Sequence, residues 1–314
     1  MNKNSSEQLG FHAKTTHLEN SIFAWYYILV FLVAVPGNVL ALWVFAHHKK
    51  NKVSTVFLKN LAVADVCYML LLPMRIVYHL MDGHWPFGEI LCRVAGYLFY
   101  LNMYCSLYFM TCISLDRFLA IVFPVQSLRL RKPCYATVIV VILWLVLIIT
   151  MLPMLTSKQT VQAHNVTLCK QLYREHISKK AVGSLAVAFT IPLVTIVVSY
   201  ILIIRKLWDK HQERGLLKKK AIQMIVLILA NFFIAFVPYH INRFVYISAY
   251  CNKTLTDNQR ASLAFGNCVT SALTCISGIL DPVMYFYLTK TFQKTLLSLF
   301  SRRNADDTEQ PSTS

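Results

Sequence analysis

Residues 134–155 read CYATVIVVILWLVLIITMLPML and include no charged side chain. An apolar run of about 20 residues is long enough to cross the hydrocarbon core of a bilayer as a helix. Similar runs recur along the chain, and they predict seven membrane spans near residues 22–46, 54–81, 89–122, 134–155, 181–208, 217–248 and 262–288. A membrane β-barrel would alternate apolar and polar residues in segments of about 10 residues, and this alternation is absent from the sequence.

The composition of the whole chain also indicates a membrane protein. Of its 314 residues, 56% are hydrophobic and only 14% are charged, and the mean hydropathy is +0.51. A soluble domain normally carries about a quarter charged residues, so this chain has too few to cover a water-facing surface. The net charge of +17 would suit a nucleic-acid-binding protein, but in so apolar a chain we assign the basic residues to membrane flanks and expect no nucleic-acid partner.

The distribution of lysine and arginine predicts the orientation in the membrane. Three lysines follow the first span within residues 49–52, whereas only Lys14 lies close before it. Because cytosolic loops carry an excess of basic residues, this pattern places the N-terminus outside the cell and, after seven spans, the C-terminus inside. The same alternation assigns to the cytosolic side the basic clusters at 129–132, 205–220 and 290–303.

The N-glycosylation sequons fit this orientation, since none of them falls in a predicted cytosolic loop. They begin at Asn4 in the N-terminal tail, at Asn165 in the second outer loop and at Asn252 in the third. The sequence therefore predicts a glycoprotein.

The nine cysteines are too few for a disulfide scaffold and have no zinc-site spacing. Cys92 opens the third span and Cys169 lies in the second outer loop, so both face the oxidising side, and we predict a disulfide between them. This bridge would hold the loop over the mouth of the bundle. Cys251 is left on the outer side without an assigned partner, and the other six cysteines are expected to be packed thiols.

Five short motifs occur in order along the spans. They are LAVAD at 61–65, DRF at 116–118, Trp144, FVPY at 236–239 and DPVMY at 281–285. In their order and spacing they resemble the signature of the rhodopsin-like (class A) G-protein-coupled receptors across nearly the whole chain.

Three positions depart from the usual form of these motifs. Phe118 stands in place of tyrosine, Phe236 in place of tryptophan and Asp281 in place of asparagine. All three substitutions occur in the purinergic and lipid-receptor branch of the family, and the chain most resembles the members of this branch that respond to uracil nucleotides and cysteinyl leukotrienes. The closer resemblance is carried by GHWPFGE at 83–89, FYLNMY at 99–104, SLAVAFT at 184–190 and YHINR at 239–243.

The resemblance implies an all-α membrane protein, a seven-transmembrane helix bundle with a short cytosolic amphipathic helix after the last span. We expect an extracellular N-terminal tail over 1–21, a receptor domain over 22–300 with the amphipathic helix near 289–300, and a disordered cytosolic tail over 301–314. The sequence has no nucleophile elbow, phosphate-binding loop or metal-ligand spacing. We therefore expect no enzyme, and no metal or cofactor other than an allosteric sodium ion.

Charged and aromatic side chains in the outer halves of the spans predict a ligand site. Arg75 and Tyr78 share one helix face, and Phe236, His240 and Arg243 share another. An arginine inside a membrane is unfavourable by about 2.5–3.5 kcal/mol on insertion scales, and its guanidinium can bind a carboxylate or phosphate with two parallel hydrogen bonds. The predicted ligand-binding residues are Arg75, Tyr78, Tyr100, Tyr104, Arg174, Tyr239, His240 and Arg243.

The same residues have a purely structural interpretation. Arg75 and Arg243 lie near span ends, where long side chains can extend to the lipid headgroups. His240 could be a packed histidine, and the tyrosines could serve packing first and ligand contact second. The orientation of the two arginines distinguishes the two interpretations.

A carboxylate deep in the second span, Asp65, must be paired, protonated or bound to an ion. The resemblance assigns a sodium and switch cluster to Asp65, Asn102, Ser106, Ser277 and Asp281. A water-bridged polar network with Asn38 is the alternative. The resemblance also assigns G-protein coupling to Asp116, Arg117, Tyr200 and Tyr285, and an activation switch to Phe232, Phe236 and Pro238.

The expected function is that of a receptor at the plasma membrane. It would bind an extracellular anionic ligand, either a lipid carboxylate such as a cysteinyl leukotriene or a uracil nucleotide, and activate a heterotrimeric G protein of the Gi type. Arrestin, receptor kinases and membrane lipids are further expected partners. The alternatives are a constitutively active receptor without a physiological agonist and, less favoured because the sequence has no internal repeat, a membrane transporter.

Overall fold

The computed structural model describes residues 16–47, 52–163, 166–169, 179–209, 215–251, 256–289 and 292–298. Within these ranges, seven helical segments are long and apolar enough to cross a membrane. They are His17–His47, Val53–Leu80, Gly88–Val122, Pro133–Thr156, Gly183–Trp208, Ala221–Ser248 and Ala261–Leu288. The predicted seven-helix bundle is therefore confirmed, with each segment overlapping its predicted span.

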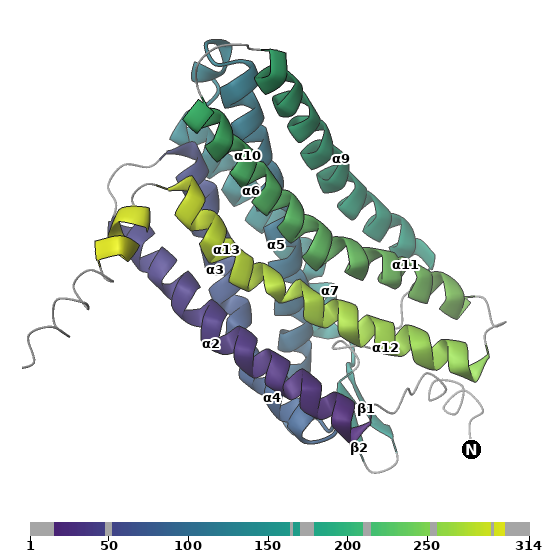
Figure 1. The fold of residues 1–314 in the computed structure, drawn as a ribbon. Coiled ribbons are helices and arrows are strands. Elements are labelled where there is room, and N and C mark those ends of the chain that lie inside the picture. The colour runs from purple at the N-terminus through teal and green to yellow at the C-terminus, as the bar shows by residue number, and fades with distance from the viewer. Residues whose placement is uncertain are drawn as a thin grey trace, which may run out of the picture.

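Three of these segments belong to uninterrupted helices, α2 (His17–His47), α5 (Gly88–Val122) and α9 (Lys179–Asp209). The other four are each divided into two pieces: α3 (Val53–Met69) with α4 (Leu72–Leu80), α6 (Pro133–Met151) with α7 (Pro153–Thr156), α10 (Gly215–Asn231) with α11 (Val237–Cys251), and α12 (Asp257–Thr274) with α13 (Ile276–Leu288). The helices run side by side in one elongated bundle (Figure 1).

Proline accompanies three of the four interruptions. Pro73 and Pro153 lie in the first turns of α4 and α7, where a missing backbone N–H is tolerated. Pro238 lies two residues after a π-helical turn over Phe232–Phe236, and such turns mark the insertion of an extra residue into a helix. The fourth interruption, at Cys275, has no proline, and the sequence does not predict it.

The first helix begins earlier than the first predicted span. Thr16 and Glu19 cap it reciprocally: the Glu19 N–H donates to the Thr16 hydroxyl at 3.2 Å, and the Thr16 N–H donates to the Glu19 carboxylate at 2.6 Å. This capping box satisfies amide groups that a helix end otherwise leaves without partners. Residues 17–21, which we assigned to the tail, therefore extend α2.

The helix α5 forms the centre of the bundle, because it packs against α3, α6 and α9 and buries side chains along its whole length. In contrast, α6 buries only Ala136, Val140 and Leu147 and exposes most of its valine, leucine and isoleucine side chains. An apolar outer surface of this kind is unfavourable in water and favourable in lipid, which agrees with the seven spans.

A small antiparallel hairpin follows α7. Its strands are β1 (Thr160–Ala163) and β2 (Val166–Cys169), with Thr160 opposite Cys169. The hairpin lies near the beginning of α2, at the lower end of the bundle in Figure 1. We call this the hairpin end, and the opposite end, where α5 carries Asp116, the Asp116 end.

After α13, residues 292–298 form a short helix. Phe292 is 3% exposed, and its ring lies 6.3 Å from that of Tyr285 and 6.5 Å from that of Phe45. The outward positions Lys294 and Ser298 are exposed. The helix predicted near 289–300 is therefore present over these residues, with an apolar anchor at its start.

Some predictions concern residues outside the described ranges. They are the N-terminal tail up to residue 15, the sequons at Asn4, Asn165 and Asn252, the ligand-site residue Arg174 and the cytosolic tail over 301–314.

Candidate functional site

The guanidinium of Arg75, on α4, points into the bundle. Its side chain is buried, with 2% of the residue exposed, and its Nη1 donates to the Tyr27 hydroxyl at 3.2 Å. The guanidinium carbon lies 4.8 Å from the ring centre of Phe99 and 5.7 Å from those of Tyr27 and Tyr68. Aromatic faces attract a cation, so three rings from α2, α3 and α5 hold the charge away from the lipid.

Arg243, on α11, is buried to the same extent, with 2% exposed. Its guanidinium carbon lies 5.5 Å from the ring centre of Tyr246, one turn further along the same helix. Both arginines are thus enclosed by protein near the hairpin end, as the ligand-site interpretation expects and the headgroup interpretation does not.

A chain of aromatic contacts joins the surroundings of Arg75 to α11. Phe99 meets Tyr239 edge-on at 5.8 Å between ring centres, and the Tyr239 hydroxyl donates to that of Tyr100 at 3.0 Å. Phe99 and Tyr100 belong to α5 and Tyr239 belongs to α11, so these contacts join the two helices. A ligand that moved Arg75 would disturb this contact directly.

The remaining predicted tyrosines occupy two different surroundings. Tyr104 faces His240 edge-on at 6.0 Å, so it lies on the α11 side of the bundle. Tyr78 instead packs against Trp85 at 6.3 Å, beneath the hairpin. The structure therefore brings Tyr100, Tyr104 and Tyr239 together and places Tyr78 in a neighbouring aromatic cluster.

His240 lies between α9 and α11. Its Nδ1 bonds to the carbonyl oxygen of Phe236 at 2.8 Å, and its ring stacks on Phe189 with centres 4.1 Å apart. Phe189 also stacks on Phe232 at 5.7 Å. The sequence does not identify Phe189 as a partner of the predicted activation-switch residue Phe232, because Phe189 belongs to a span that is distant in the chain.

A disulfide and several hydrogen bonds attach the hairpin to the bundle. The predicted disulfide Cys92–Cys169 is present, with Cα atoms 5.7 Å apart. The Glu89 carboxylate accepts the backbone N–H groups of Gln159 at 2.7 Å and Thr160 at 2.8 Å, the Thr160 hydroxyl, and the Arg93 Nε at 2.7 Å. Glu89 is a structural residue that our sequence reasoning missed, although an acidic residue in the first turn of a span is a visible signal.

Asp65 and its neighbours form a buried polar cluster in the middle of the bundle. The Asn102 amide donates to Asp65 Oδ1 at 2.9 Å, and the Tyr285 hydroxyl lies 3.5 Å from Asp65 Oδ2 and 3.4 Å from the Asn38 amide oxygen. Asp65, Asn102 and Ser277 border a cavity of about 10 Å³, roughly the space of one water molecule. Three of the predicted switch residues, Asp65, Asn102 and Ser277, thus border one cavity, and Tyr285 links Asp65 to Asn38.

Asp281 extends this cluster. Its Oδ1 accepts the Asn231 amide at 2.7 Å. The nearby Ser106 hydroxyl of α5 is buried and has no hydrogen-bond partner among the described residues. The Asp281 carboxyl group is close enough to that of Asp65 for the two to interact electrostatically. Two neighbouring buried carboxyl groups cannot both carry an uncompensated charge, so the cluster is suited to a shared proton or a small cation.

At the Asp116 end, Arg117 and Asp116 form an ion pair of 2.5 Å, and Arg117 also donates to the Ser54 hydroxyl at 3.0 Å. Arg131 forms a second ion pair with Asp116 at 2.7 Å. The nearby Tyr200 hydroxyl accepts a hydrogen bond from Ser114 at 2.7 Å. The participation of Arg131 is not visible in the sequence, because it depends on how the loop after α5 folds back.

Comparisons with known proteins agree with this geometry. The sequence profile of the 7 transmembrane receptor (rhodopsin family) matches residues 37–285. The uracil nucleotide/cysteinyl leukotriene receptor of Rattus norvegicus is 52% identical over 295 residues, covering 94% of this chain and 86% of the relative, and that of Homo sapiens is 50% identical, covering 94% and 80%. Cysteinyl leukotriene receptor 1 of Homo sapiens is 35% identical, covering 91% of this chain and 87% of the relative.

Proposed function

Because this chain belongs to the rhodopsin family of seven-transmembrane receptors, we propose that it binds an extracellular anionic small molecule at the hairpin end and activates a heterotrimeric G protein, of the Gi type, at the Asp116 end. It is a multi-pass membrane receptor of the purinergic and cysteinyl leukotriene receptor type and not an enzyme. In this proposal the protein resides in the plasma membrane, with its N-terminus outside and its C-terminus in the cytosol, as the basic clusters indicate.

The observation that carries the ligand class is the burial of Arg75 and Arg243 near the same end of the bundle, each with 2% exposed. A guanidinium keeps its positive charge when it is buried, so an anionic group beside it is favoured over a neutral or cationic one. A carboxylate or phosphate group matches the planar donor fork of arginine. The relatives are named for uracil nucleotides and cysteinyl leukotrienes, which both carry such groups.

The proposed signal path starts at Arg75 and reaches α11. Phe99 lies 4.8 Å from the Arg75 guanidinium and 5.8 Å from the Tyr239 ring, and Tyr239 follows Pro238 just after the π-helical turn. Ligand binding would favour one packing of α11 against α5 over another by its differential affinity for the two. Movement of α10, continuous with this segment, would then release Arg117 to the G protein. Arrestin and receptor kinases would act at the same end.

We further propose that a sodium ion occupies the polar cluster of Asp65 and Asp281 and stabilises the inactive packing. The supporting geometry is the cavity of about 10 Å³ beside Asp65, Asn102 and Ser277, together with the Ser106 hydroxyl, which is buried and has no hydrogen-bond partner in the described part of the chain. Hydroxyl, amide and carboxylate oxygens are suitable ligands for a hard cation.

The test is GTPγS binding by Gi in membranes that contain the receptor, over a panel of leukotriene and uracil nucleotide agonists. Arg243→Ala should raise the half-maximal concentration of the active anion at least about 10-fold, because a charge-assisted hydrogen bond contributes about 1.5–3 kcal/mol. Arg243→Lys should be intermediate, since it keeps the charge and loses the fork. Cell-surface labelling of each variant controls for delivery. Unchanged potency in Arg243→Ala would remove this residue from the site.

The same assay separates the alternative functions. A constitutively active receptor would show high GTPγS binding that no anion changes and that Arg117→Ala removes. A transporter would accumulate a labelled anion in vesicles whether or not Arg117 is replaced. Ligand-dependent GTPγS binding that Arg117→Ala abolishes supports the proposed function against both.

A further inference from the structure

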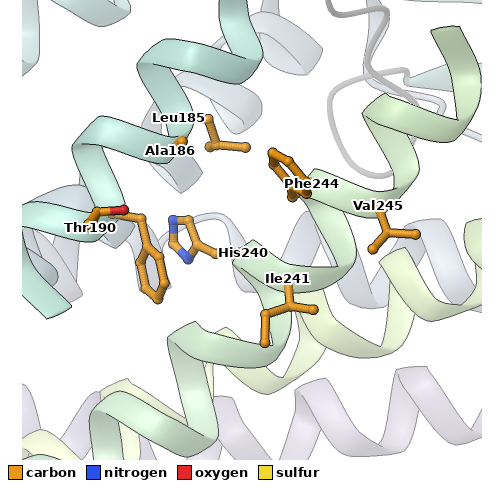
Figure 2. Close-up of a pocket in the computed structure, with 8 residues that line it drawn as sticks. Leu185, Ala186, Thr190, His240, Ile241, Phe244 and Val245 are labelled. Atoms are coloured by element: carbon orange, nitrogen blue, oxygen red, sulfur yellow. The ribbon is translucent and has the colours of Figure 1, made fainter.

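A cavity of about 250 Å³ lies between α9 and α11 (Figure 2). Leu185, Ala186 and Thr190 line it from α9, and His240, Ile241 and Phe244 line it from α11. Ile241 is 59% exposed and Phe244 48% exposed. Since both residues lie within the membrane span Ala221–Ser248, the cavity opens toward the lipid side of the bundle.

The imidazole of His240 supplies the principal polar group of this cavity. Figure 2 shows it reaching from α11 toward α9, between Thr190 and Leu185. His240 is only 4% exposed, and its Nε2 is buried and has no hydrogen-bond partner among the described residues. Buried polar atoms are normally hydrogen-bonded, so an unpartnered nitrogen at the edge of a cavity indicates a missing ligand group.

The hydrogen bond at the other ring nitrogen determines what this ligand group must be. Nδ1 lies 2.8 Å from the Phe236 carbonyl oxygen, which can only accept, so Nδ1 carries the proton. In the neutral imidazole, Nε2 is then an acceptor and requires a donor such as a hydroxyl. Stacking on Phe189 at 4.1 Å fixes the ring, so Nε2 is held in place to receive the donor.

We propose that this cavity binds a membrane lipid that carries an uncharged hydroxyl group. The hydroxyl donates to His240 Nε2, and the hydrocarbon lies against Leu185, Ile241 and Phe244. With the imidazole neutral, the described lining contains no charged group, so a charged headgroup would enter without compensation. The cavity of about 250 Å³ is smaller than the about 300–1,000 Å³ of sites for drug-sized ligands, so it holds the hydroxyl-bearing end while the chain extends along the exposed faces of the helices.

Water is a poorer occupant of this site. A buried water molecule typically makes about three hydrogen bonds, and the side chains of the described lining offer two polar groups, the His240 nitrogen and the Thr190 hydroxyl, among apolar side chains. A lipid hydroxyl satisfies His240 with one hydrogen bond and covers the apolar lining with its chain. Its approach from the bilayer requires no passage through the central site of Arg75 and Arg243.

The position of the site gives it influence on signalling, and this part of the inference rests on the proposed function. His240 lies one turn beyond the π-helical turn Phe232–Phe236, and Phe189 stacks on both His240 and Phe232. A lipid between α9 and α11 would therefore increase the separation of two helices whose packing, in the proposed function, changes on activation. It would act as a modulator separate from the anionic agonist.

The experiment measures binding directly, with the purified full-length receptor in phosphatidylcholine nanodiscs. The probe is a long-chain alcohol with a diazirine next to the hydroxyl-bearing carbon, and its methyl ether is the matched control because it cannot donate a hydrogen bond. We expect photolabelling of α9 and α11 by the alcohol to exceed that by the ether several-fold. His240→Phe keeps the ring stacking and should reduce alcohol labelling to the level of the ether.

Two further variants on α9 complete the design. Ala186→Phe fills the cavity without touching the imidazole and should reduce labelling by both probes. Gly183→Ala lies one turn away, where an added methyl group meets nothing within 4 Å, and should label as the wild type does. Thermal melting of each purified variant verifies that it is folded.

Equal labelling by alcohol and ether would overturn the role of His240, and labelling that Ala186→Phe leaves unchanged would overturn the site. Stronger labelling by the corresponding carboxylate would overturn the uncharged hydroxyl chemistry. Because photolabelling requires no G protein, a receptor that binds the alcohol at this site but ignores every anion would refute the proposed function and leave this site standing.

Discussion

Arg131 donates from Nε to Oδ1 of Asp116 at 2.7 Å, while Arg117 donates to Oδ2 of the same carboxylate at 2.5 Å. The Asp116 side chain is 2% exposed, and those of the two arginines are 24% and 26% exposed. One buried carboxylate therefore forms ion pairs with two cations. The two guanidinium groups repel each other across it, so each arginine is held less tightly than it would be alone.

Removing Arg131 should accordingly strengthen the hold of Asp116 on Arg117. We expect Arg131→Ala to lower basal and agonist-stimulated G-protein activation about 2- to 5-fold, which corresponds to about 0.5–1 kcal/mol for a partly exposed ion pair. GTPγS binding at matched surface expression measures the effect. Arg129→Ala is the control, because Arg129 is exposed in the same loop. A rise in basal activation would show instead that Arg131 restrains the receptor.

Sodium should weaken agonist binding if the Asp65 cluster holds the ion in the inactive packing. Replacing choline chloride by sodium chloride at constant ionic strength should reduce agonist affinity about 5-fold or more, since allosteric coupling is typically about 1–3 kcal/mol. Asp65→Asn should abolish this difference, because it removes one of the two facing carboxyl groups. Radioligand competition in both salts provides the measurement.

Asp281→Asn offers a more discriminating comparison. It restores the residue usual at this position of the family motif and retains an oxygen that can accept the Asn231 amide hydrogen bond of 2.7 Å. We expect sodium sensitivity to persist in this variant, with a shifted half-maximal concentration. Sodium sensitivity that survives Asp65→Asn would contradict the assignment of the ion to this cluster.

Glu89 should stabilise the hairpin over the mouth of the bundle. Glu89→Ala leaves the N–H groups of Gln159 and Thr160 without their acceptor, and an unsatisfied donor costs about 1–3 kcal/mol when buried. Since the Glu89 side chain is 27% exposed, water can replace part of the loss, and we expect about 1 kcal/mol. Thermal unfolding of the purified receptor should rank wild type above Glu89→Gln, and Glu89→Gln above Glu89→Ala. Equal destabilisation by Glu89→Gln and Glu89→Ala would mean that the negative charge, not the acceptor oxygen, is what matters.

The parts of the structure that follow from local sequence were predictable. The spans depend on runs of apolar residues. For Arg75 and Arg243 the sequence left two directions open, inward or toward the headgroups, and the structure shows the inward one. The disulfide followed from the compartment that Cys92 and Cys169 share. Such inferences need only the residue types in a segment and the environment, lipid or oxidising compartment, in which the segment lies.

The pairings within the site were not predictable in this way. Asn231 reaches Asp281 from 50 positions away, and Glu89 accepts N–H groups 70 and 71 positions away. Such contacts depend on helix rotation and on the path of loops, which hydrophobic periodicity determines only to within a face. The helix interruption at Cys275 was missed for a related reason, since no proline or glycine marks it.

The packing of α2 against α13 leaves no room for a side chain at Gly37. A Cβ atom built there would lie 2.8 Å from Pro282 Cγ and 3.0 Å from Pro282 Cβ, and the proline ring cannot rotate away. We expect Gly37→Ala to destabilise the receptor by about 1–3 kcal/mol, the usual cost of overpacking.

Gly278→Ala on the facing helix is the matched comparison. Its added Cβ would lie 2.9 Å from the terminal methyl group of Met69, the end of a flexible side chain that can adopt another rotamer. This variant should therefore unfold close to the wild-type temperature, while Gly37→Ala unfolds several degrees lower. If Gly278→Ala proved the more damaging of the two, the rigidity of Pro282 would not be what limits the approach of α2, and the close contact at Gly37 would have to relax by movement of the whole helix.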